Sequence, residues 1–544
     1  MFQRFDFRPT DSRSWLWSLP WLTVVMLVAL TLRSSRVDHS LWLDELHTAW
    51  TVDGGVSEIA SRARMGNVGP LYFYLVWAVT RLTSFDEVGL RILSVAAGIL
   101  LVPLSWWTTG RLTGSQAAAL LAALLVAVDH TCLYYSQNAR PYALLQVVAL
   151  LHVVLFATLV EKPSCRRRVA FILATVLMFY LHYTSLLLLT GEWAYYAIYR
   201  VVALQRAQYR LRQLALDMGW AAAICLPSLG HLAEISARRH NWAAFVPRRG
   251  ILDVVTLYPL PAYLLWPLLV TALLVLWRKH FPRRSHRAQR PLVSQRRELL
   301  KPLVLLTCWF AVPLVVAWGV TWTDVARLFL RRYTLVSFID LPLATAYVWA
   351  SLPRFYARAV YLAVLLVGVQ MTDGVARNLF ELGRVSRHGR ENWRDAVAWV
   401  NRRTQEMAAL DAHTAWPVFI RSGLIESDAL RGSASPPLTE FCLLPVASIY
   451  PLTGNHRAVV PLPRTDSGNL DDEQLALIGR SGGAWFIVRG PPQVVDLLTT
   501  RLLARLAGRH ITANLLRRRD FDRITVLEFV TTKTAATSRF HERH

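Results

Sequence analysis

The feature that most constrains this chain is a series of apolar blocks, each long enough to cross a lipid bilayer. A helix needs about 20 apolar residues to span a hydrocarbon core of about 30 Å. The chain has 544 residues, of which 54% are hydrophobic and only 18% charged, and this balance is too apolar for one soluble core. We therefore predict a polytopic α-helical membrane protein with about eleven spans. Their centres lie near residues 24, 99, 123, 150, 178, 195, 223, 269, 312, 342 and 365.

The net charge of +24 does not indicate nucleic-acid binding, because much of it lies in short loops between the apolar blocks. With eleven spans, the most basic segments all fall on one side of the membrane, which the positive-inside rule assigns to the cytoplasm. The N-terminus is then cytoplasmic and the C-terminus lies outside. These basic segments are residues 4–13, 162–168, 200–212 and 278–301.

The outer side then holds a long first loop at about residues 33–88, a second loop at 234–261, and the tail. We divide the chain into a transmembrane domain, residues 1–374, and an outer soluble domain, residues 375–544. In the tail, helix-like stretches alternate with β-rich runs, which predicts a small α/β domain. The helix-like stretches are residues 396–403 and 494–506, and the β-rich runs are 417–420, 484–488 and 524–530.

Two adjacent carboxylates, Asp44 and Glu45, lie early in the first outer loop, just beyond the end of a span. A carboxylate there can take a proton from an acceptor hydroxyl, or the pair can belong to a solvated turn. Asn67 and Tyr72 belong to an aromatic segment in which Pro70 suits the first turn of a helix. We expect this helix to lie in the membrane surface, either as part of a site or as an interfacial anchor.

A polar and aromatic cluster at residues 134–142 follows the third span. Arg140 carries a fixed fork of donors that suits a phosphate group, although an arginine can also snorkel to the interface. The cluster also contains Tyr135, Gln137, Asn138 and Tyr142.

Arg331, Arg332 and Tyr333 open the tenth span on the outer side, where two adjacent arginines call for an anionic partner. That partner is either a lipid headgroup or a lipid-linked phosphate. His182 and Asp340 lie inside apolar blocks, where a titratable side chain is costly and so marks a functional candidate or a satisfied interior residue.

In this order, these motifs resemble the GT-C superfamily of membrane glycosyltransferases. They resemble bacterial relatives of dolichyl-phosphate-mannose protein mannosyltransferase and lipid A aminoarabinose transferase, over roughly residues 40–375. The matching motifs are Asp44-Glu45, the segment around Pro70-Leu71-Tyr72, Glu87 with Arg91 and Ser94, Tyr135 to Leu144, and Arg332-Tyr333. Trp393-Arg394 resembles the start of the outer domain that many members carry.

The resemblance implies a membrane-embedded transferase that moves a hexose or pentose, with inversion, from a polyprenyl-phosphate donor. Asp44 is then the general base and Glu45 orients it or the acceptor, while Arg140, Arg332 and Arg331 bind the donor phosphate. The substrate cavity is lined by Asn67, Tyr72, Arg91, Tyr135, Gln137, Asn138, Tyr142, His182 and Tyr333. The chain departs from the family pattern at Val68 and Gly69, where relatives carry His or Lys and Pro, and at Asn138, where relatives carry Glu.

The expected partners are a polyprenyl-phosphate-linked sugar, membrane lipid, and an unidentified protein, lipid or glycan acceptor. The expected location is the inner membrane of a bacterium. The sequence gives no basis for predicting a cofactor, and the five cysteines show no zinc-site spacing. Asp44 and Glu45 could ligate a divalent cation, but no third ligand is evident, so metal dependence stays open. The rival interpretations are a transporter or lipid flippase, which favours related halves and broken helices, and a non-catalytic membrane scaffold.

Overall fold

The computed structural model describes residues 12–201, 208–239, 241, 246–280, 293–373, 375–383, 391–431, 435–465 and 468–533. The chain divides into two compact units. The first comprises residues 1–37, 66–79 and 91–387, and the second comprises residues 38–65, 80–90 and 388–544. The predicted boundary between residues 374 and 375 stays a prediction. The second unit joins part of the first predicted outer loop to the C-terminal region.

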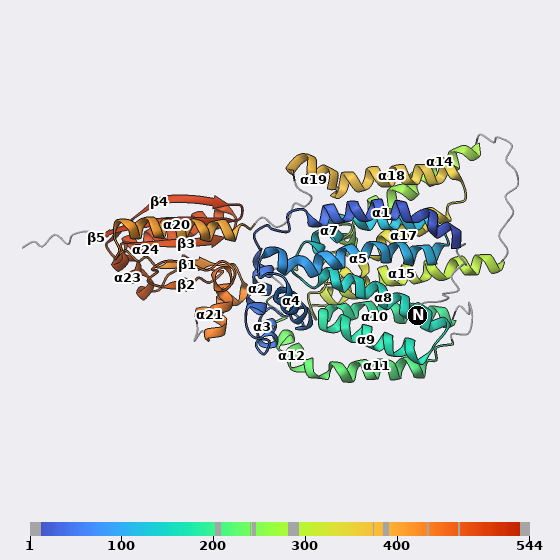
Figure 1. Cartoon of the computed structure of the whole chain (residues 1–544), viewed down its shortest axis with the longest axis horizontal. Helices are drawn as coiled ribbons and strands as arrows, with labels where there is room; N and C mark the ends of the chain where they lie inside the picture. Colours follow the sequence, from blue (N-terminus) through green and yellow to red (C-terminus); the bar gives the residue numbers. More distant parts are fainter. Residues whose placement is uncertain are drawn as a thin grey trace, which may run out of the picture. The chain divides into compact units, whose positions relative to one another are not determined.

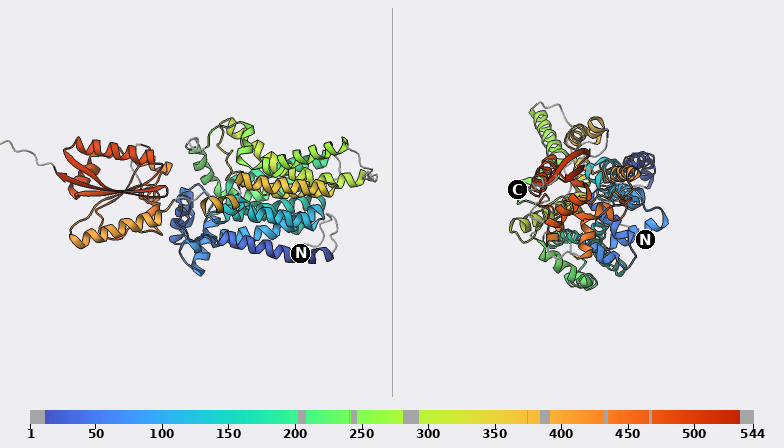
Figure 2. Two further views of the ribbon diagram at one scale, coloured as in Figure 1. Left: turned by 90° about the horizontal axis from the view of Figure 1, so that it is seen from above. Right: turned by 90° about the vertical axis from the view of Figure 1, so that its left-hand side faces the viewer.

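The first unit is a bundle of apolar helices (Figures 1 and 2). Helix α8 packs beside α9, α10 beside α15, and α1 beside α6. All of the predicted span centres lie within helices. The helices are α1 Ser12–Ser34, α4 Leu71–Leu82, α5 Glu87–Thr113, α6 Gln116–Val128, α7 His130–Ser136, α8 Tyr142–Glu161, α9 Cys165–Leu181, α10 Leu187–Val201, α11 Leu211–Cys225, α12 Leu229–Ala237, α13 Val254–Leu257, α14 Trp266–His280, α15 Val293–Trp322, α16 Leu335–Phe338, α17 Asp340–Ser351, α18 Phe355–Asp373 and α19 Val375–Leu382, of which α4 and α5 extend into residues 80–90.

Within the described residues, five helices are long and apolar enough to cross a membrane, or six if the bent pair α6 and α7 forms one span. The predicted count of about eleven therefore stays a prediction. The remaining predicted spans fall on shorter helices because the chain breaks at polar or turn-forming positions. The predicted tenth span is divided between α16 and α17, and the short turn Tyr183–Leu186 separates α9 from α10.

The break between α6 and α7 bends the chain by 57°. Asp129 caps α7 by accepting a hydrogen bond from the backbone N–H of Cys132 at 2.8 Å. The buried guanidinium of Arg33 on α1 donates to the carbonyls of Ala127 and Val126, both at 2.9 Å. These carbonyls lie at the end of α6, where the broken helix leaves them without intrahelical partners. Arg33 therefore stabilises a helix break that hydrocarbon alone would penalise.

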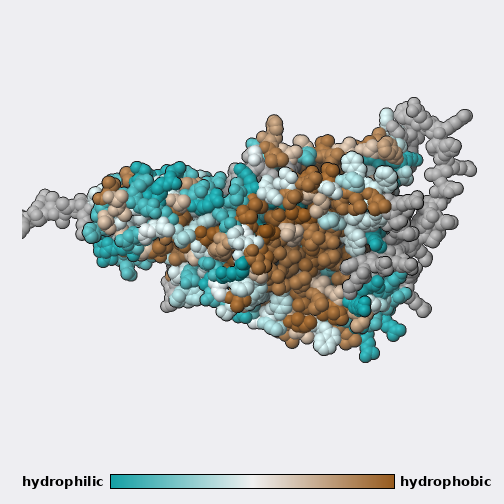
Figure 3. All heavy atoms as spheres, in the orientation of Figure 1, coloured by the Kyte–Doolittle hydropathy of each residue, from teal (hydrophilic) through white to brown (hydrophobic). Residues whose placement is uncertain are grey.

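The surface of the first unit carries large apolar side chains, seen as the broad brown region over the helices in Figure 3. On α1, Trp17 is 82% exposed and Trp21 66% exposed, and Trp277 on α14 is 61% exposed. A contiguous apolar surface of this kind is unfavourable in water and expected in lipid. The surface therefore agrees with a bundle embedded in a membrane.

The second unit contains a five-stranded sheet with the order β2-β1-β3-β5-β4. Strand β1 runs parallel to β2 and β3, whereas β5 runs antiparallel to β3 and β4. The strands are β1 Val418–Arg421, β2 Val459–Pro461, β3 Gly483–Arg489, β4 Ile511–Phe521 and β5 Ile524–Lys533. The three predicted β-rich runs correspond to β1, β3 and β5. Strand β4 did not fit the strand pattern, because it is an exposed edge strand rich in arginine.

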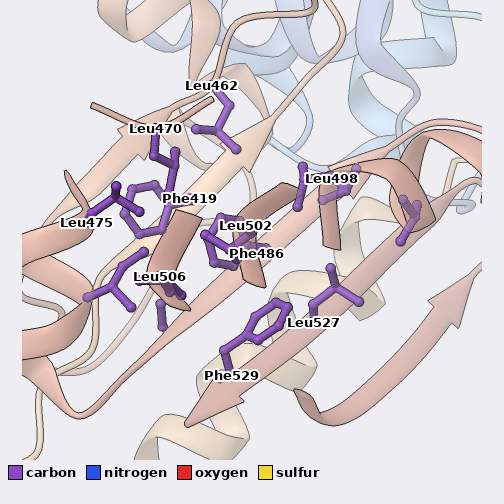
Figure 4. Packing of buried hydrophobic residues seen from close by; sticks show 14 residues of the cluster. Phe419, Leu462, Leu470, Leu475, Phe486, Leu498, Leu502, Leu506, Leu527 and Phe529 are labelled. Atoms are coloured by element: carbon purple, nitrogen blue, oxygen red, sulfur yellow. The ribbon is translucent and has the colours of Figure 1, made fainter. Parts of the chain in front are cut away.

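Helices cover both faces of this sheet (Figure 2). On one face Trp399 of α20 packs edge-on against Trp485 of β3, with ring centroids 5.6 Å apart. On the other face Leu502 of α24 packs with Phe486 and Phe529 in a fully buried apolar core (Figure 4). The helices of this unit are α2 Leu43–Asp53, α3 Ile59–Met65, α20 Trp393–Leu410, α21 Pro436–Cys442, α22 Leu444–Ala447, α23 Asp472–Ser481 and α24 Pro492–Ala507. The predicted fold class, a helical membrane domain with a C-terminal α/β domain, is confirmed.

Candidate active site

The two predicted acidic residues lie in the first turn of α2, in the second unit. Glu45 is fully buried, and its Oε2 accepts a hydrogen bond from the backbone N–H of Trp42 at 3.3 Å. Its side chain therefore turns back to cap its own helix. Asp44 is only half-buried. The local geometry thus gives the two neighbouring carboxylates different environments.

Beyond its first turn, helix α2 also contacts α3 and α21. Nε2 of His47 lies 3.0 Å from the carbonyl oxygen of Arg62 on α3, and Arg62 in turn donates to the carbonyl of Trp50 at 2.6 Å. The rings of His47 and Trp50 pack against Phe441 of α21 at 5.5 and 5.9 Å. Helix α2 is therefore a packed element of the second unit.

In the first unit, four aromatic rings from separate segments form a continuous row. The ring of Tyr135 lies 4.8 Å from that of Tyr142, which lies 5.7 Å from His182, which in turn lies 5.9 Å from Tyr333. These residues come from α7, the start of α8, the end of α9 and the segment before α16. The fold thus brings together four residues that the sequence predicted to line one cavity.

Three arginines accompany this row. Arg332 lies over the ring of Tyr333 at 5.0 Å and donates to its hydroxyl at 3.2 Å. Arg140 is only 5% exposed, and both Arg140 and Arg332 interact electrostatically with His182. Nε of Arg331 donates to the carbonyl of Leu257 at 2.6 Å. We call the row of rings with these arginines the arginine–aromatic cluster: Tyr135, Arg140, Tyr142, His182, Arg331, Arg332 and Tyr333.

A second set of predicted residues supports the backbone around this cluster. The Ser94 hydroxyl donates to the carbonyl of Arg140 at 3.1 Å and therefore accepts from the hydroxyl of Tyr72 at 2.8 Å. Arg91 donates to the carbonyl of Val37 at 2.8 Å. Tyr72 and Arg91, predicted to line the cavity, thus hold helix and loop backbone in place through the contacts described.

The three predicted site residues with side-chain amides form hydrogen bonds within the first unit. Asn67, which has a left-handed φ of 57°, accepts from Arg238 at 2.8 Å. The Gln137 amide donates to the carbonyl of Leu32 at 2.9 Å, and that of Asn138 to the carbonyl of Tyr134 at 2.7 Å. These hydrogen bonds link neighbouring segments of the first unit, and the part of the three amide side chains in substrate binding stays a prediction.

A buried polar triad in the bundle was not among the residues predicted from the sequence. His152 on α8 lies 2.8 Å from Glu192 on α10 and 2.8 Å from Thr175 on α9. The signal that could have revealed it was a single titratable residue in each of two apolar blocks, the same signal that singled out His182 and Asp340. Asp340 is 1% exposed and begins α17, outside the arginine–aromatic cluster.

Among the described residues, no group of three or more His, Cys, Asp or Glu side chains could hold a metal ion. The first unit does contain a small apolar pocket between α5, α8 and α15. It includes none of the predicted site residues. Its lining is Trp107, Thr108, Arg111, Leu112, Val153, Val154, Ala157, Leu305, Leu306 and Trp309.

The chain thus combines a bundle of apolar helices, several of them long enough to cross a membrane, with a small α/β domain. Residues 67–230 match the family described as dolichyl-phosphate-mannose-protein mannosyltransferase. Among curated proteins no match is found. Solved structures of ArnT from Cupriavidus metallidurans match in two forms, one bound to undecaprenyl phosphate and one in the apo state. In each case the identity is 13%, the TM-score is 0.50, and the match covers 95% of this chain and 98% of that chain.

At this identity the likeness to ArnT concerns the fold. Together with the family match over residues 67–230, it supports the predicted resemblance to GT-C membrane glycosyltransferases such as the protein mannosyltransferases and ArnT. The predicted resemblance is therefore confirmed, and the long apolar helices support the predicted multi-pass membrane protein. The orientation of its termini stays a prediction.

Proposed function

We propose that this protein transfers a sugar from a polyprenyl-phosphate donor to an acceptor at the outer face of a bacterial inner membrane. The observation that carries the proposal is the arginine–aromatic cluster. Arg140 is buried, Arg332 is half-buried, and both interact with His182, so positive charge is concentrated in a largely desolvated region. The guanidinium groups of such arginines have the planar, forked N–H geometry that suits a phosphate group, and a lipid-linked phosphate is an anion of this kind. The match to a structure of ArnT bound to undecaprenyl phosphate supports this class of donor.

The proposed reaction is a single inverting displacement. The acceptor oxygen forms a bond to the anomeric carbon while the bond from that carbon to the phosphate oxygen breaks. The bonding electron pair leaves with the polyprenyl phosphate, whose developing charge is stabilised by Arg140 and Arg332, with Arg331 as a further contributor. Fixed charges in a site that excludes water stabilise such a transition state strongly. The acceptor proton moves to Asp44.

The different environments of the two acidic residues support Asp44 as the base. Glu45 is buried and its carboxylate caps α2, so it is already engaged in holding the helix. Asp44 is half-buried, so part of this residue is accessible from solvent. We therefore assign proton removal to Asp44 and orientation of the helix that carries it to Glu45.

The test is sugar transfer and donor cleavage by the purified full chain in nanodiscs, with a panel of polyprenyl-phosphate hexoses and pentoses. We expect one donor class to be consumed by the wild type and the Asp44→Asn variant to be slower by about 10²- to 10⁴-fold. Arg140→Ala should lose about 10²- to 10³-fold. Arg248→Ala is the matched control. It removes the same positive charge, but from an exposed arginine that pairs with Asp324.

Equal turnover by wild type and Asp44→Asn would reject Asp44 as the base. If Arg140→Ala and Arg248→Ala lost the same activity, the effect would be one of overall charge, and the phosphate site would be wrong. No consumption of any donor, together with lipid movement across the bilayer, would favour the transporter or flippase interpretation instead.

A further inference from the structure

The segment that leads into α2, residues 38–43, is held by four hydrogen bonds from the C-terminal part of the second unit. The carbonyl of Asp38 accepts from the Arg394 guanidinium at 2.9 Å, and the Ser40 hydroxyl accepts from the backbone N–H of Arg394 at 3.1 Å. The remaining two bonds come from the backbone N–H groups of Leu41 and Leu43. Four such bonds over six consecutive residues leave this segment little freedom to move.

Glu391 is the central acceptor. It is only 5% exposed, and its Oε2 accepts from the Leu43 N–H at 3.0 Å and from the Trp393 indole at 3.1 Å. Its Oε1 accepts from Nε of Arg489, at the end of β3, at 2.7 Å. Leu43 is the first residue of α2, and its N–H is one of the groups that a helix start leaves without an intrahelical partner. A buried carboxylate at this end also interacts favourably with the positive end of the helix dipole.

Tyr450 provides the second fixed point. Its hydroxyl accepts from the Leu41 N–H at 2.9 Å and donates to Oε1 of Glu87 at 2.9 Å. The same Glu87 oxygen accepts from the guanidinium of Arg394 at 3.2 Å. Tyr450 is 7% exposed. The hydroxyl is thus satisfied on both sides inside the protein.

The motif from Glu391 to Asp395 begins α20, and its members divide between two tasks. The Asn392 side chain caps α20 by accepting from the Asp395 N–H at 3.2 Å, and the Trp393 ring is fully buried. The carboxylate of Glu391 and the side chain of Arg394 instead reach residues 38–43. A helix start needs only the cap, so the other two polar side chains have a separate use.

We propose that Glu391, Arg394 and Tyr450 are positioning residues for Asp44. Together they form a clamp, by which we mean these three side chains and their bonds to residues 38–43. The clamp fixes the start of α2 and so the direction of the Asp44 carboxylate, which is one residue beyond Leu43. The C-terminal domain is then part of the catalytic apparatus through these positioning contacts. This inference rests on the proposed role of Asp44 as general base.

The experiment combines backbone exchange with kinetics in the full chain in nanodiscs. Tyr450→Phe removes one hydroxyl and keeps the ring, so it is the mildest change. In Glu391→Gln the amide group must face one of the donors that now bind the carboxylate. Glu406→Gln is the matched control, because Glu406 pairs with Arg403 on the same helix α20 and makes no contact with residues 38–43 among those described.

We expect both clamp variants, but not the control, to speed hydrogen exchange in peptides that cover residues 41–46. Their kcat should fall by about 10- to 100-fold, as small misplacements of a catalytic group do, with the donor KM within about threefold of wild type. In an Asp44→Asn background the same variants should lower the residual rate little further, because a clamp acts through the group that is already gone.

Unchanged exchange or unchanged kcat in an active enzyme would overturn the clamp alone. A clamp variant whose loss multiplies with that of Asp44→Asn would also overturn it, because its effect would then be independent of Asp44. A folded wild type that transfers no sugar would instead overturn the proposed function, and the positioning role would fall with it.

Discussion

Nδ1 of His152 lies 2.8 Å from Oε1 of Glu192, and both side chains are buried inside the helical bundle. The other ring nitrogen of His152 lies 2.8 Å from the hydroxyl of Thr175. Because Thr175 donates its only proton to the carbonyl of Phe171 at 2.9 Å, its oxygen must accept from His152. The Nδ1 position therefore shares a proton with Glu192, and three helices are joined through one imidazole.

Loss of one member of this pair should destabilise the bundle. We expect Glu192→Leu to lower the free energy of unfolding by about 3 kcal/mol, because it leaves Nδ1 of His152 buried without its partner. The double variant His152→Leu with Glu192→Leu should cost less than the sum of the single changes, since apolar pairs replace buried polar pairs well. Unfolding in detergent measures both, and additive losses would show that the two side chains are not coupled.

Arg33 should stabilise the break between α6 and α7. We expect Arg33→Met to lower the free energy of unfolding by about 1–3 kcal/mol, because the carbonyls of Val126 and Ala127 lose their donors in an apolar environment. The exposed Arg36 offers a control with the same loss of charge. Equal unfolding curves for Arg33→Met and Arg36→Met would mean that water or another group satisfies the broken helix.

The second unit should lose stability as the pH falls, partly through His456. Burial lowers the pKa of His456 below its ordinary value of 6.5. Above pH 6.5 the side chain is neutral in both states and contributes its full share of stability. Below it, the unfolded chain binds a proton that the folded chain resists, so this share is lost as the pH falls from 6.5 towards the folded pKa.

His456→Gln should remove this part of the pH dependence. Unfolding of the second unit can be followed between pH 5 and 8 by exchange of the buried β3 amides, which report on its core. His510 is the matched control, since it belongs to the same unit and its side chain is exposed. An unchanged pH profile in His456→Gln, or an equal change in His510→Gln, would contradict the assignment.

Cysteine labelling should report on the orientation of the chain. Cys165 is exposed at the start of α9, in a segment predicted to be cytoplasmic, whereas Cys442 is buried in the second unit. Burial raises the pKa of the Cys442 thiol to about 12, so little reactive thiolate forms at neutral pH. We expect a membrane-impermeant maleimide to label Cys165 only after cells are permeabilised, and Cys165→Ser to abolish that signal. Labelling of Cys165 in intact cells would reverse the predicted topology.

Much of the fold follows from local sequence patterns. The apolar blocks place the helices of the bundle, because an element that must satisfy its own backbone in hydrocarbon has few alternatives to a helix. The runs that became β1, β3 and β5 were visible because buried strands are rich in β-branched and aromatic residues. Strand β4 was not visible, because its exposed arginines carry no such pattern and it exists only by pairing with β5.

The residue types of the candidate site could be read from the sequence, whereas the neighbours of each residue in space were decided by the tertiary structure. The sequence alone singled out Asp44, Arg140, His182 and Arg332. An ionisable side chain in or beside an apolar span is costly, and such a residue is therefore a candidate for function. That His182 meets Tyr142 and Tyr333 was decided by the packing of helices distant in the chain. The bond from Leu43 to Glu391 was beyond any local pattern, because 348 residues separate the two and only the folded second unit brings a backbone N–H to a carboxylate.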